Sequence, residues 1–404
     1  AEHFKHTFTS YPYHMPFAPC PMRKSAKKGS STVSRAVFAL RGVKKYGNRH
    51  KVNDQRASKQ GNRVYFCKKR DMLIADGSAA DRRPLRSRRP YMKQFAIFVD
   101  SGANIPNDIR IARDIRVIPF RYTVDGEERP CFTEDMPFEE TAKQFYDAMR
   151  AGAEAKTSLL TAGTFEGALR PVLEEGRDVL LFTISSGISG TYAQAKEAAD
   201  NLMKEYPGRK VYALDSANAS LGEGLIAIKV ADLRDLGESA QACAEWVREN
   251  TYKMNSFLTV DDLKYLRRSA RISRTVAIAG TLLNIKPILR ADESDNAKIV
   301  ACGKARGRRK ALESIAQIFA ERAVRPESST VAIAHGDCLE DAKYLARLLQ
   351  AKGANDIIIE YYDLCTGSHV GPGTVALFFW GKDRRAALPE VQKQPAANPV
   401  TYKA

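Results

Sequence analysis

The sequence has no run of about 18 apolar residues, and its first residues lack the apolar core of a secretory signal. A membrane-spanning or secreted protein is therefore not indicated. Its seven cysteines are an odd number, are scattered along the chain and include no Cys-x-x-Cys pair. That pattern disfavours a disulfide framework and a zinc site. We therefore expect a cytoplasmic protein without a structural metal.

Two groups of enzyme motifs are also missing. No P-loop and no Gly-x-Gly-x-x-Gly motif follows the first expected strand, and Gly222 and Gly224 open a helix without the third glycine. The Gly-x-Ser-x-Gly elbow of many serine hydrolases is absent as well. These absences disfavour the commonest nucleotide-binding sites and the commonest serine hydrolase site.

The net charge of +17 is unevenly distributed. Residues 1–91 carry 22 Lys and Arg against five Asp and Glu, whereas the remaining residues carry 42 of each. The whole excess therefore lies in residues 1–91, which we expect to form a disordered or weakly ordered basic arm. Because Met92 directly precedes the first good strand, we expect the functional polypeptide to start there. Nucleic-acid binding through the arm stays an alternative, although no recognition motif accompanies it.

From Met92 onward, apolar strand patterns alternate with helical ones, which predicts an α/β protein with parallel strands. We expect two α/β domains, residues 92–254 and 255–385, followed by a loose tail over 386–404. A strand or hairpin is expected over 116–124, turned by Asp125-Gly126. The other expected strands are 95–100, 178–184, 210–215, 257–260, 286–291, 298–302, 330–334, 356–361 and 374–380. One helix is expected to begin at Pro106. The other expected helices cover 139–149, 165–175, 191–206, 221–236, 239–250, 262–268, 275–283, 309–323 and 339–351.

One loop rich in serine and glycine, residues 185–190, joins a buried strand to a long helix. Its hydroxyls and the unpaired N–H groups of the helix start would converge on one point. The helix dipole adds positive potential there, so the loop favours an anion. An ordinary loop whose hydroxyls cap the helix explains the same pattern and stays open.

Three further clusters contain candidate anion-binding groups. Lys156-Thr157-Ser158 precedes a helix, where its hydroxyls can cap the helix or bind an anion. The basic run of residues 304–310 begins another helix, where positive charge opposes the dipole and calls for an anion, unless it is a solvated surface. His369 lies in a loop framed by Gly367 and Gly371-Pro372-Gly373, which would hold its imidazole in one direction.

Ser186 and His369 also suggest a second chemistry. A serine nucleophile with a histidine base would make an acyl hydrolase or acyltransferase. The sequence identifies no acid to orient the histidine, and the cluster of hydroxyls suits hydrogen-bond donation better. Hydrolysis of activated acyl esters without a partner would distinguish this alternative.

Eight short stretches, in order between Phe95 and Phe379, resemble the DegV family of bacterial fatty-acid-binding proteins, whose members include the acyl-carrying subunit of fatty acid kinase. Two positions depart from the family pattern, because Leu160 replaces a frequent proline and Ser269-Ala270 replaces a usual Gly-Gly. The stretches are Val99-Asp100-Ser101, Lys156-Thr157-Ser158, the Ser-Ser-x-x-Ser-Gly-Thr-Tyr run from Ser185, Leu214-Asp215-Ser216, Asp261-Asp262-Leu263-Lys264-Tyr265-Leu266 with Arg271-Ile272, Lys286-Pro287-Ile288-Leu289, Gly303-Lys304-x-Arg306 and His369-x-Gly371-Pro372-Gly373.

This resemblance implies a lipid tunnel between the two domains that holds a long-chain fatty acid, with no cofactor. It implies that a fatty acid kinase catalytic subunit phosphorylates the bound carboxylate to an acyl-phosphate, so the protein is not itself an enzyme. Hydroxyls, an arginine and a protonated histidine would supply charge-assisted hydrogen bonds to the carboxylate. Arg271 corresponds to an arginine expected on the kinase-facing surface. The residues that correspond to the carboxylate site are Thr157, Ser185, Ser186 (the more direct contact of the two serines), Arg306 and His369.

Overall fold

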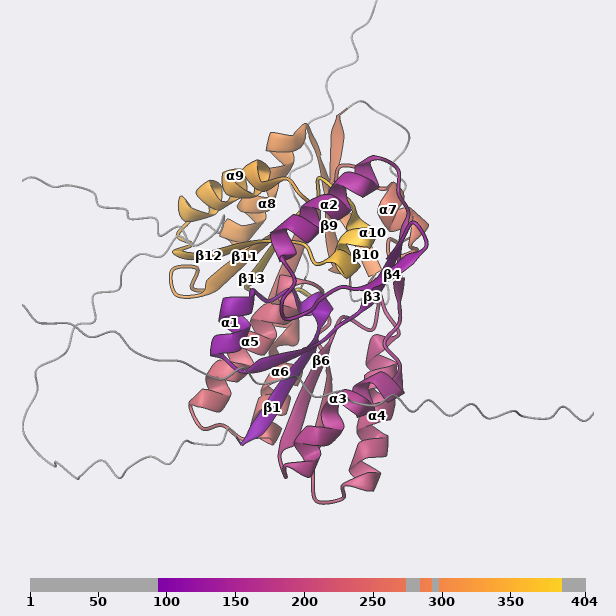
Figure 1. The fold of residues 1–404 in the computed structure, drawn as a ribbon. Helices are drawn as coiled ribbons and strands as arrows, with labels where there is room; N and C mark the ends of the chain where they lie inside the picture. Colours follow the sequence, from indigo (N-terminus) through magenta and orange to yellow (C-terminus); the bar gives the residue numbers. More distant parts are fainter. Residues whose placement is uncertain (1–93, 274–283, 293–297, 387–404) are drawn as a thin grey trace, which may run out of the picture. The chain divides into compact units, whose positions relative to one another are not determined.

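The computed structural model describes residues 94–273, 284–292 and 298–386, coloured in Figure 1. Several expectations fall outside these residues. They are the basic arm and the start at Met92, the helix over 275–283, most of the polar turn after residue 291, and the tail that follows Ala386.

The first sheet is parallel, with strand order β2-β1-β6-β7. Its central strands β1 and β6 are buried almost throughout, as expected where helices cover both faces of a parallel sheet. Thr183 and Asp215 are paired neighbours, so the chain leaves β6 and β7 at the same edge. The strands are β1 (Phe95–Asp100), β2 (Ile115–Ile118), β6 (Asp178–Thr183) and β7 (Val211–Asp215).

A small antiparallel sheet is formed by strands that lie between β2 and β6 in the sequence. Its strand order is β4-β3-β5. Asp125 and Gly126 both have positive φ, of 53° and 85°, which suits the tight turn between β3 and β4. The hairpin turn expected at Asp125-Gly126 is confirmed between β3 and β4, whereas the segment expected as one strand over 116–124 is divided between β2 and β3, which belong to two different sheets. The strand β5, which contains Thr157, was not expected. The strands are β3 (Arg121–Val124), β4 (Glu127–Pro130) and β5 (Ala155–Ser158).

The second large sheet is mixed, with strand order β10-β9-β8-β13-β11-β12. Within this sheet only β11 and β12 pair in parallel, so the parallel pairing expected from alternating strands and helices does not extend to its other strands. Helix α9 (Leu339–Gln350) crosses over between β11 and β12, whereas the shorter connection between β9 and β10 suits antiparallel pairing. The strands are β8 (Met254–Thr259), β9 (Ile285–Asp292), β10 (Lys298–Arg306), β11 (Thr330–His335), β12 (Asp356–Tyr361) and β13 (Val375–Trp380).

Helix α5 (Leu221–Asp235) packs against strands of both large sheets, namely β1, β6, β8, β11 and β13 (Figure 1). Gly224 is needed for this position, because a Cβ there would lie 2.5 Å from the carbonyl oxygen of Ala103. Gly222 lies close to Phe378, where a Cβ would be 3.0 Å from the ring. These two glycines therefore serve close packing between the sheets.

Among the remaining helices, α3, α4, α6, α8 and α9 pack on strands of the two large sheets, whereas α10 packs against α7, β3 and β5 (Figure 1). Helix α10 was not expected, because Gly367 and Gly371 indicated a loop around His369. Gly367 instead serves packing, since a Cβ there would clash with the hydroxyl of Tyr146. These helices are α1 (Asn107–Ala112), α2 (Phe138–Arg150), α3 (Ala162–Glu174), α4 (Thr191–Glu205), α6 (Ala240–Asn250), α7 (Lys264–Arg268), α8 (Arg308–Arg322), α9 (Leu339–Gln350) and α10 (Leu364–Val370), with 3-10 turns at Ser101–Ala103 and Thr251–Lys253.

Candidate functional site

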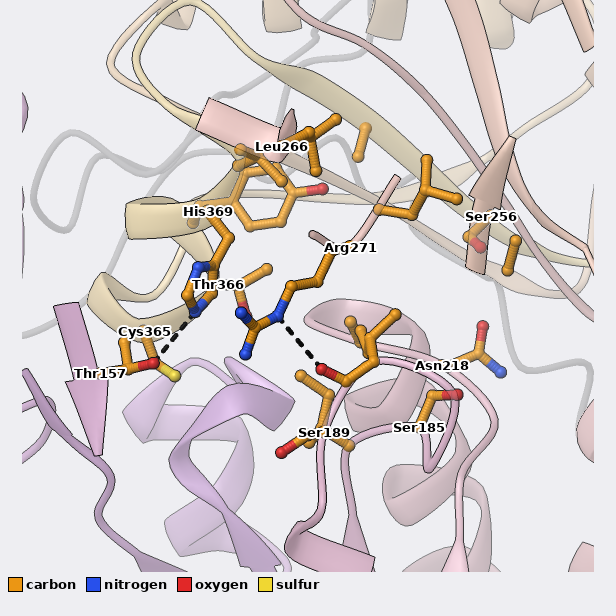
Figure 2. Close-up of a pocket in the computed structure, with 18 of the residues that line it drawn as sticks. Thr157, Ser185, Ser189, Asn218, Ser256, Leu266, Arg271, Cys365, Thr366 and His369 are labelled. Carbon is orange, nitrogen blue, oxygen red and sulfur yellow. Dashed lines mark hydrogen bonds between the residues drawn. The ribbon is translucent and has the colours of Figure 1, made fainter. Parts of the chain in front are cut away.

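A cavity of about 200 Å³ opens where the chain leaves β6 and β7. Its walls come from both large sheets, from β5 and from α10 (Figure 2). The polar side chains that line it are Thr157, Ser158, Ser185, Ser189, Asn218, Ser256, Arg271, Thr366 and His369. The apolar lining includes Phe120, Ile184, Ile188, Leu258, Leu266, Ile299, Val370 and Phe378. The cavity thus combines an apolar wall with hydroxyls, an imidazole and a guanidinium.

Thr157 and His369 meet at one side of the cavity (Figure 2). Their Oγ1 and Nε2 atoms are 3.0 Å apart, which is a hydrogen bond across 212 residues of sequence. Thr157 is held by the pairing of β5 with β3. His369 is held in the last turn of α10, whose first turn is capped by Asp363 through a 2.7 Å bond from the amide of Thr366. The pair therefore depends on two separate elements.

Ser185 is buried at the carboxyl end of β6. Its amide donates to the carbonyl oxygen of Asn218 at 2.8 Å, and its hydroxyl accepts from the amide of Gly187 at 3.2 Å. The preceding amide, that of Ile184, donates to the buried carboxyl of Asp100 at 2.8 Å. The serine loop is thus fixed by groups at the end of β1 and after β7, the two strands on either side of β6.

Arg271 extends between the Thr157–His369 pair and the serine loop (Figure 2). Its Nε donates to the carbonyl oxygen of Ile188 at 3.2 Å, and its Nη1 donates to that of Ser269 at 2.6 Å. Burial lowers the pKa of this guanidinium. Ala270 has a φ of 57°, a conformation that favours glycine. Glycine is the residue usual at this position in the family that the sequence resembles. Arg271 therefore brings a partly desolvated positive charge into the cavity.

The imidazole of His369 is neutral in the free cavity. Burial, together with the smaller effect of the charges of Arg271 and Arg268, lowers its pKa to about 3. The protonated histidine expected from sequence is therefore not the form found without a ligand. A neutral imidazole can donate one hydrogen bond and accept another. It is also a weak base, far from the pKa near 7 that suits general-base catalysis.

Comparison with known proteins decides the family. The family model described as "Uncharacterised protein, DegV family" matches residues 94–382. The chain belongs to the DegV family. A DegV domain-containing protein from Clostridium perfringens is 36% identical over 291 residues, which cover 72% of this chain and 98% of that protein.

Solved structures of DegV proteins share the fold. One from Thermus thermophilus, described with fatty acid binding, has a TM-score of 0.62 and 28% identity over 71% of this chain and 99% of its own. DegV from Bacillus subtilis, described as a fatty acid binding protein, has a TM-score of 0.60 and 29% identity over 70% of this chain and 98% of its own. These similarities confirm the α/β class of this DegV protein.

Four of the six residues that the sequence indicated line this cavity of the DegV protein: Thr157, Ser185, Arg271 and His369. Ser186 and Arg306 are exposed and are not among the lining residues. The amide of Ser186 donates to Asp215 at 3.2 Å, and Arg306 ends β10. Because Ser186 lies outside the cavity that contains His369, the arrangement does not support their pairing as nucleophile and base.

Two further sequence features of this DegV protein, the basic run of residues 304–310 and Leu160, are explained by their surroundings. Arg308, from the basic run, donates through Nε to Asp341 at 2.8 Å and through Nη2 to the carbonyl oxygen of Gly373 at 2.6 Å. The anion that this run calls for is therefore supplied in part by the protein itself. Leu160, the departure from a frequent proline, is buried in the core, and its neighbour Leu159 lines the cavity.

The sequence prediction missed Asn218, Ser189 and Thr366 as cavity residues. Asn218 follows β7, the neighbour of β6, and polar residues at the ends of adjacent parallel strands meet at one edge of a sheet. That signal was present in the Leu214-Asp215-Ser216 motif. Thr366 could not have been found in this way, because its helix was not expected.

Two negative findings apply to the described residues of this DegV protein. Within residues 94–273, 284–292 and 298–386, no three His, Cys, Asp or Glu residues are grouped so that they could hold a metal ion. No helix in the same ranges has the length and apolar character needed to cross a membrane.

Proposed function

We propose that this DegV protein binds a long-chain fatty acid in the cavity between its two predicted domains, residues 92–254 and 255–385. The observation that carries the proposal is the combination of an apolar wall with a guanidinium, an imidazole and several hydroxyls in one cavity. The fatty-acid binding described for the proteins from Thermus thermophilus and Bacillus subtilis supports it. A fatty acid has the same two parts, an apolar chain and an anionic end.

The carboxylate end would lie against Thr157, Ser185, Arg271 and His369. A carboxylate has only acceptor oxygens, and these four residues provide hydroxyl, guanidinium and imidazole donors. Arg271 supplies the positive charge in this arrangement, because it lines the cavity and Arg306 does not. Pairing with a carboxylate would also offset the cost of the partial desolvation of the guanidinium.

The acyl chain would supply most of the affinity. Each buried methylene contributes about 0.8 kcal/mol, so several methylenes outweigh a single hydrogen bond. The polar residues would mainly fix which way the molecule lies. The bound acid would then present its carboxyl group in a constant position.

We further propose that a partner, the catalytic subunit of a fatty acid kinase, acts on this carboxyl group. A carboxylate oxygen would attack the γ-phosphorus of ATP, with ADP leaving, and the product would be an acyl-phosphate. The low pKa of His369 supports a binding role for this chain, because such a weak base gives little help to proton transfer near neutral pH.

Lipid analysis of the purified protein tests the binding step. Native mass spectrometry should show the mass of the chain plus one fatty acid, and a fluorescent fatty acid should be displaced by unlabelled acid. The methyl ester of the same acid is the matched control, because it keeps the chain and lacks the charge. Absence of a bound lipid together with no measurable binding of fatty acids of any length would refute the proposal.

The kinase step needs a separate test. The tagged protein is isolated from its host with its partners, loaded with radiolabelled fatty acid and given ATP. Hydroxylamine then traps any acyl-phosphate as a hydroxamate. Hydroxamate that forms only with ATP and the co-isolated partner supports the step, and its absence in a complex that binds fatty acid contradicts it.

A further inference from the structure

The loop between β7 and α5, residues 216–220, forms one wall of the cavity through Ala217, Asn218 and Ala219. Two of its residues that are not glycine have left-handed φ angles, 47° at Ala217 and 54° at Ser220. Such conformations are strained and persist only where the surrounding structure holds them. The question is therefore which groups hold this wall.

Part of the support is local. The amide of Ala217 donates to Asp215 Oδ1 at 2.8 Å, and the side-chain amide of Asn218 donates to the carbonyl oxygen of Ser216 at 2.9 Å. The hydroxyl of Thr251 donates to the same carbonyl oxygen at 2.5 Å. These bonds fix the start of the loop.

The other support comes from the far end of the described chain. Arg384 follows β13, is only 4% exposed and reaches the loop with its guanidinium. Its Nη1 donates to Asn218 Oδ1 at 3.0 Å and to the carbonyl oxygen of Met254 at 3.1 Å, and its Nη2 donates to the carbonyl oxygen of Ala217. The guanidinium thus binds the strained residue, the cavity residue beside it and the first residue of β8.

The serine loop depends in turn on Asn218. The amide of Ser185 donates to the carbonyl oxygen of Asn218 at 2.8 Å. Both residues line the cavity and lie close together in Figure 2. Displacement of Asn218 would therefore also move Ser185, which is one of the proposed carboxylate donors.

We propose that Arg384 is a positioning residue for the lipid cavity: its guanidinium holds Ala217 and Asn218, and through them Ser185, in the arrangement that binds the acid. This inference rests on the proposed function for its effect on affinity. The same chain of hydrogen bonds also makes a claim about the free protein, which can be tested without any ligand.

Two arginines provide matched controls. Arg322 is 2% exposed and binds the same C-terminal segment, with Nε to Asn255 Oδ1 at 3.0 Å and Nη2 to the carbonyl oxygen of Asp383 at 2.9 Å. Its acceptors do not line the cavity. Arg385 is exposed and pairs with Asp383. Arg322→Met therefore reports loss of a buried arginine, and Arg385→Met reports the change in charge alone.

The test measures fatty-acid affinity and unfolding by urea in the same variants. Arg384→Met should weaken binding about tenfold or more, as expected for loss of buried hydrogen bonds to a charged group. Arg384→Lys, which keeps the charge but not the planar donor set, should recover part of the affinity. Arg322→Met should lower the free energy of unfolding about as much as Arg384→Met does, but should change fatty-acid affinity less than threefold. Arg385→Met should change neither the free energy of unfolding nor the affinity.

Amide exchange of the ligand-free protein provides the independent readout. The amide of Ser185 should exchange faster in Arg384→Met, and in Arg384→Lys if the Met variant does not fold, but not in Arg322→Met. Unchanged affinity and unchanged exchange in the folded Arg384 variants would overturn the inference, as would equal loss of affinity in Arg322→Met. Failure of the wild type to bind any fatty acid would refute the proposed function, while the exchange data would still decide the role of Arg384.

Discussion

The family resemblance implies a place on the kinase-facing surface for Arg271, but its guanidinium is proposed to bind the fatty-acid carboxylate. It lines the cavity and is partly desolvated, whereas Arg306 is exposed outside it. Arg271→Met should weaken fatty-acid binding about tenfold or more, the loss typical of hydrogen bonds to a charged group. The affinity for the methyl ester should change much less. Displacement of a fluorescent fatty acid measures both.

Arg306→Met is the matched control, because it removes the same charge from a residue that does not line the cavity. Its affinity should stay within about twofold of the wild type, as for most exposed charges. A loss confined to Arg306→Met would instead favour the carboxylate contact that the family resemblance implies.

His369 should change its protonation with the ligand. Burial lowers the pKa of the free imidazole to about 3, so it stays neutral between about pH 5 and about pH 8. A nearby carboxylate favours the charged form and raises the pKa. Because the bound form then has the higher pKa, affinity should increase as the pH falls through that higher value and should be constant above it. NMR titration of the histidine carbons, with and without fatty acid, measures both values.

The same titration in Thr157→Val separates the contributions to this shift. The variant removes the hydroxyl that lies 3.0 Å from Nε2 and leaves the burial of the ring. The free pKa should stay low, because burial is its main cause. An imidazole of wild-type protein that titrates near its ordinary value without ligand would contradict this account of the cavity.

Sequence reasoning identified cavity residues where local chemistry is enough. Thr157, Ser185 and His369 stand out because hydroxyls or an imidazole lie in short polar segments that follow or precede regular elements. The choice between Arg271 and Arg306 could not be made in that way. It depends on the path of the chain after α7, which brings Arg271 to the carbonyl oxygen of Ile188, 83 residues away in sequence.

Helix α10 shows what element prediction misses. Its seven residues include Gly367 and end before Gly371-Pro372-Gly373, and that composition indicates a loop. Gly367 is needed because the hydroxyl of Tyr146 on α2 approaches its Cα. A packing requirement of this kind overrides local propensity and leaves no local signal. The longer elements, such as β1 and α5, were predicted within a few residues because their apolar patterns are continuous.

The cap of α10 should make stability depend on pH. Burial raises the pKa of Asp363 to about 7, and that of neighbouring Asp100 to about 7 as well. Glu223 on α5 lies near Asp100 and Asp363. Burial raises the pKa of Glu223, and the negative charges of Asp100, Asp363 and Asp215 raise it further. The unfolded chain loses these protons near pH 4, so the free energy of unfolding should fall between about pH 4 and about pH 7 and then level off.

Asp363→Asn tests that dependence. Asparagine keeps an oxygen for the amide of Thr366, and its neutral amide replaces a buried carboxyl oxygen that has no hydrogen-bond partner among the described residues. The stability of the variant relative to wild type should rise between pH 4 and pH 7, by on the order of 4 kcal/mol. Urea unfolding at several pH values measures it. Asp147→Asn is the control, since the hydrogen bond from Lys143 lowers the pKa of exposed Asp147. The stability of this variant relative to wild type should therefore stay constant or fall between pH 4 and pH 7. A constant difference for Asp363→Asn would contradict the prediction.

At the scale of the whole molecule, the α/β class was predictable because buried strands alternate with amphipathic helices. The mixed order of the second sheet was not, since β13 inserts between β8 and β11 at the end of the chain. This insertion has a consequence for the cavity. The strand that carries Phe378 into the cavity wall also leads directly to Arg384, whose guanidinium binds the cavity residue Asn218 from outside the lining.

Removal of residues 1–91 tests which part of the chain carries the function. Among the described residues, those that line the cavity lie between Phe120 and Phe378, and the family match covers residues 94–382. The removed residues carry the whole net charge of +17 and lie outside the family match. A protein that starts at Met92 should therefore unfold cooperatively and bind fatty acid within about twofold of the full chain, as expected when no contact of the site is removed. Binding to DNA or RNA that depends on salt, if the full chain shows it, should disappear with these residues, because it requires basic groups that release counterions. Loss of fatty-acid binding on truncation would show that residues 1–91 take part in the site.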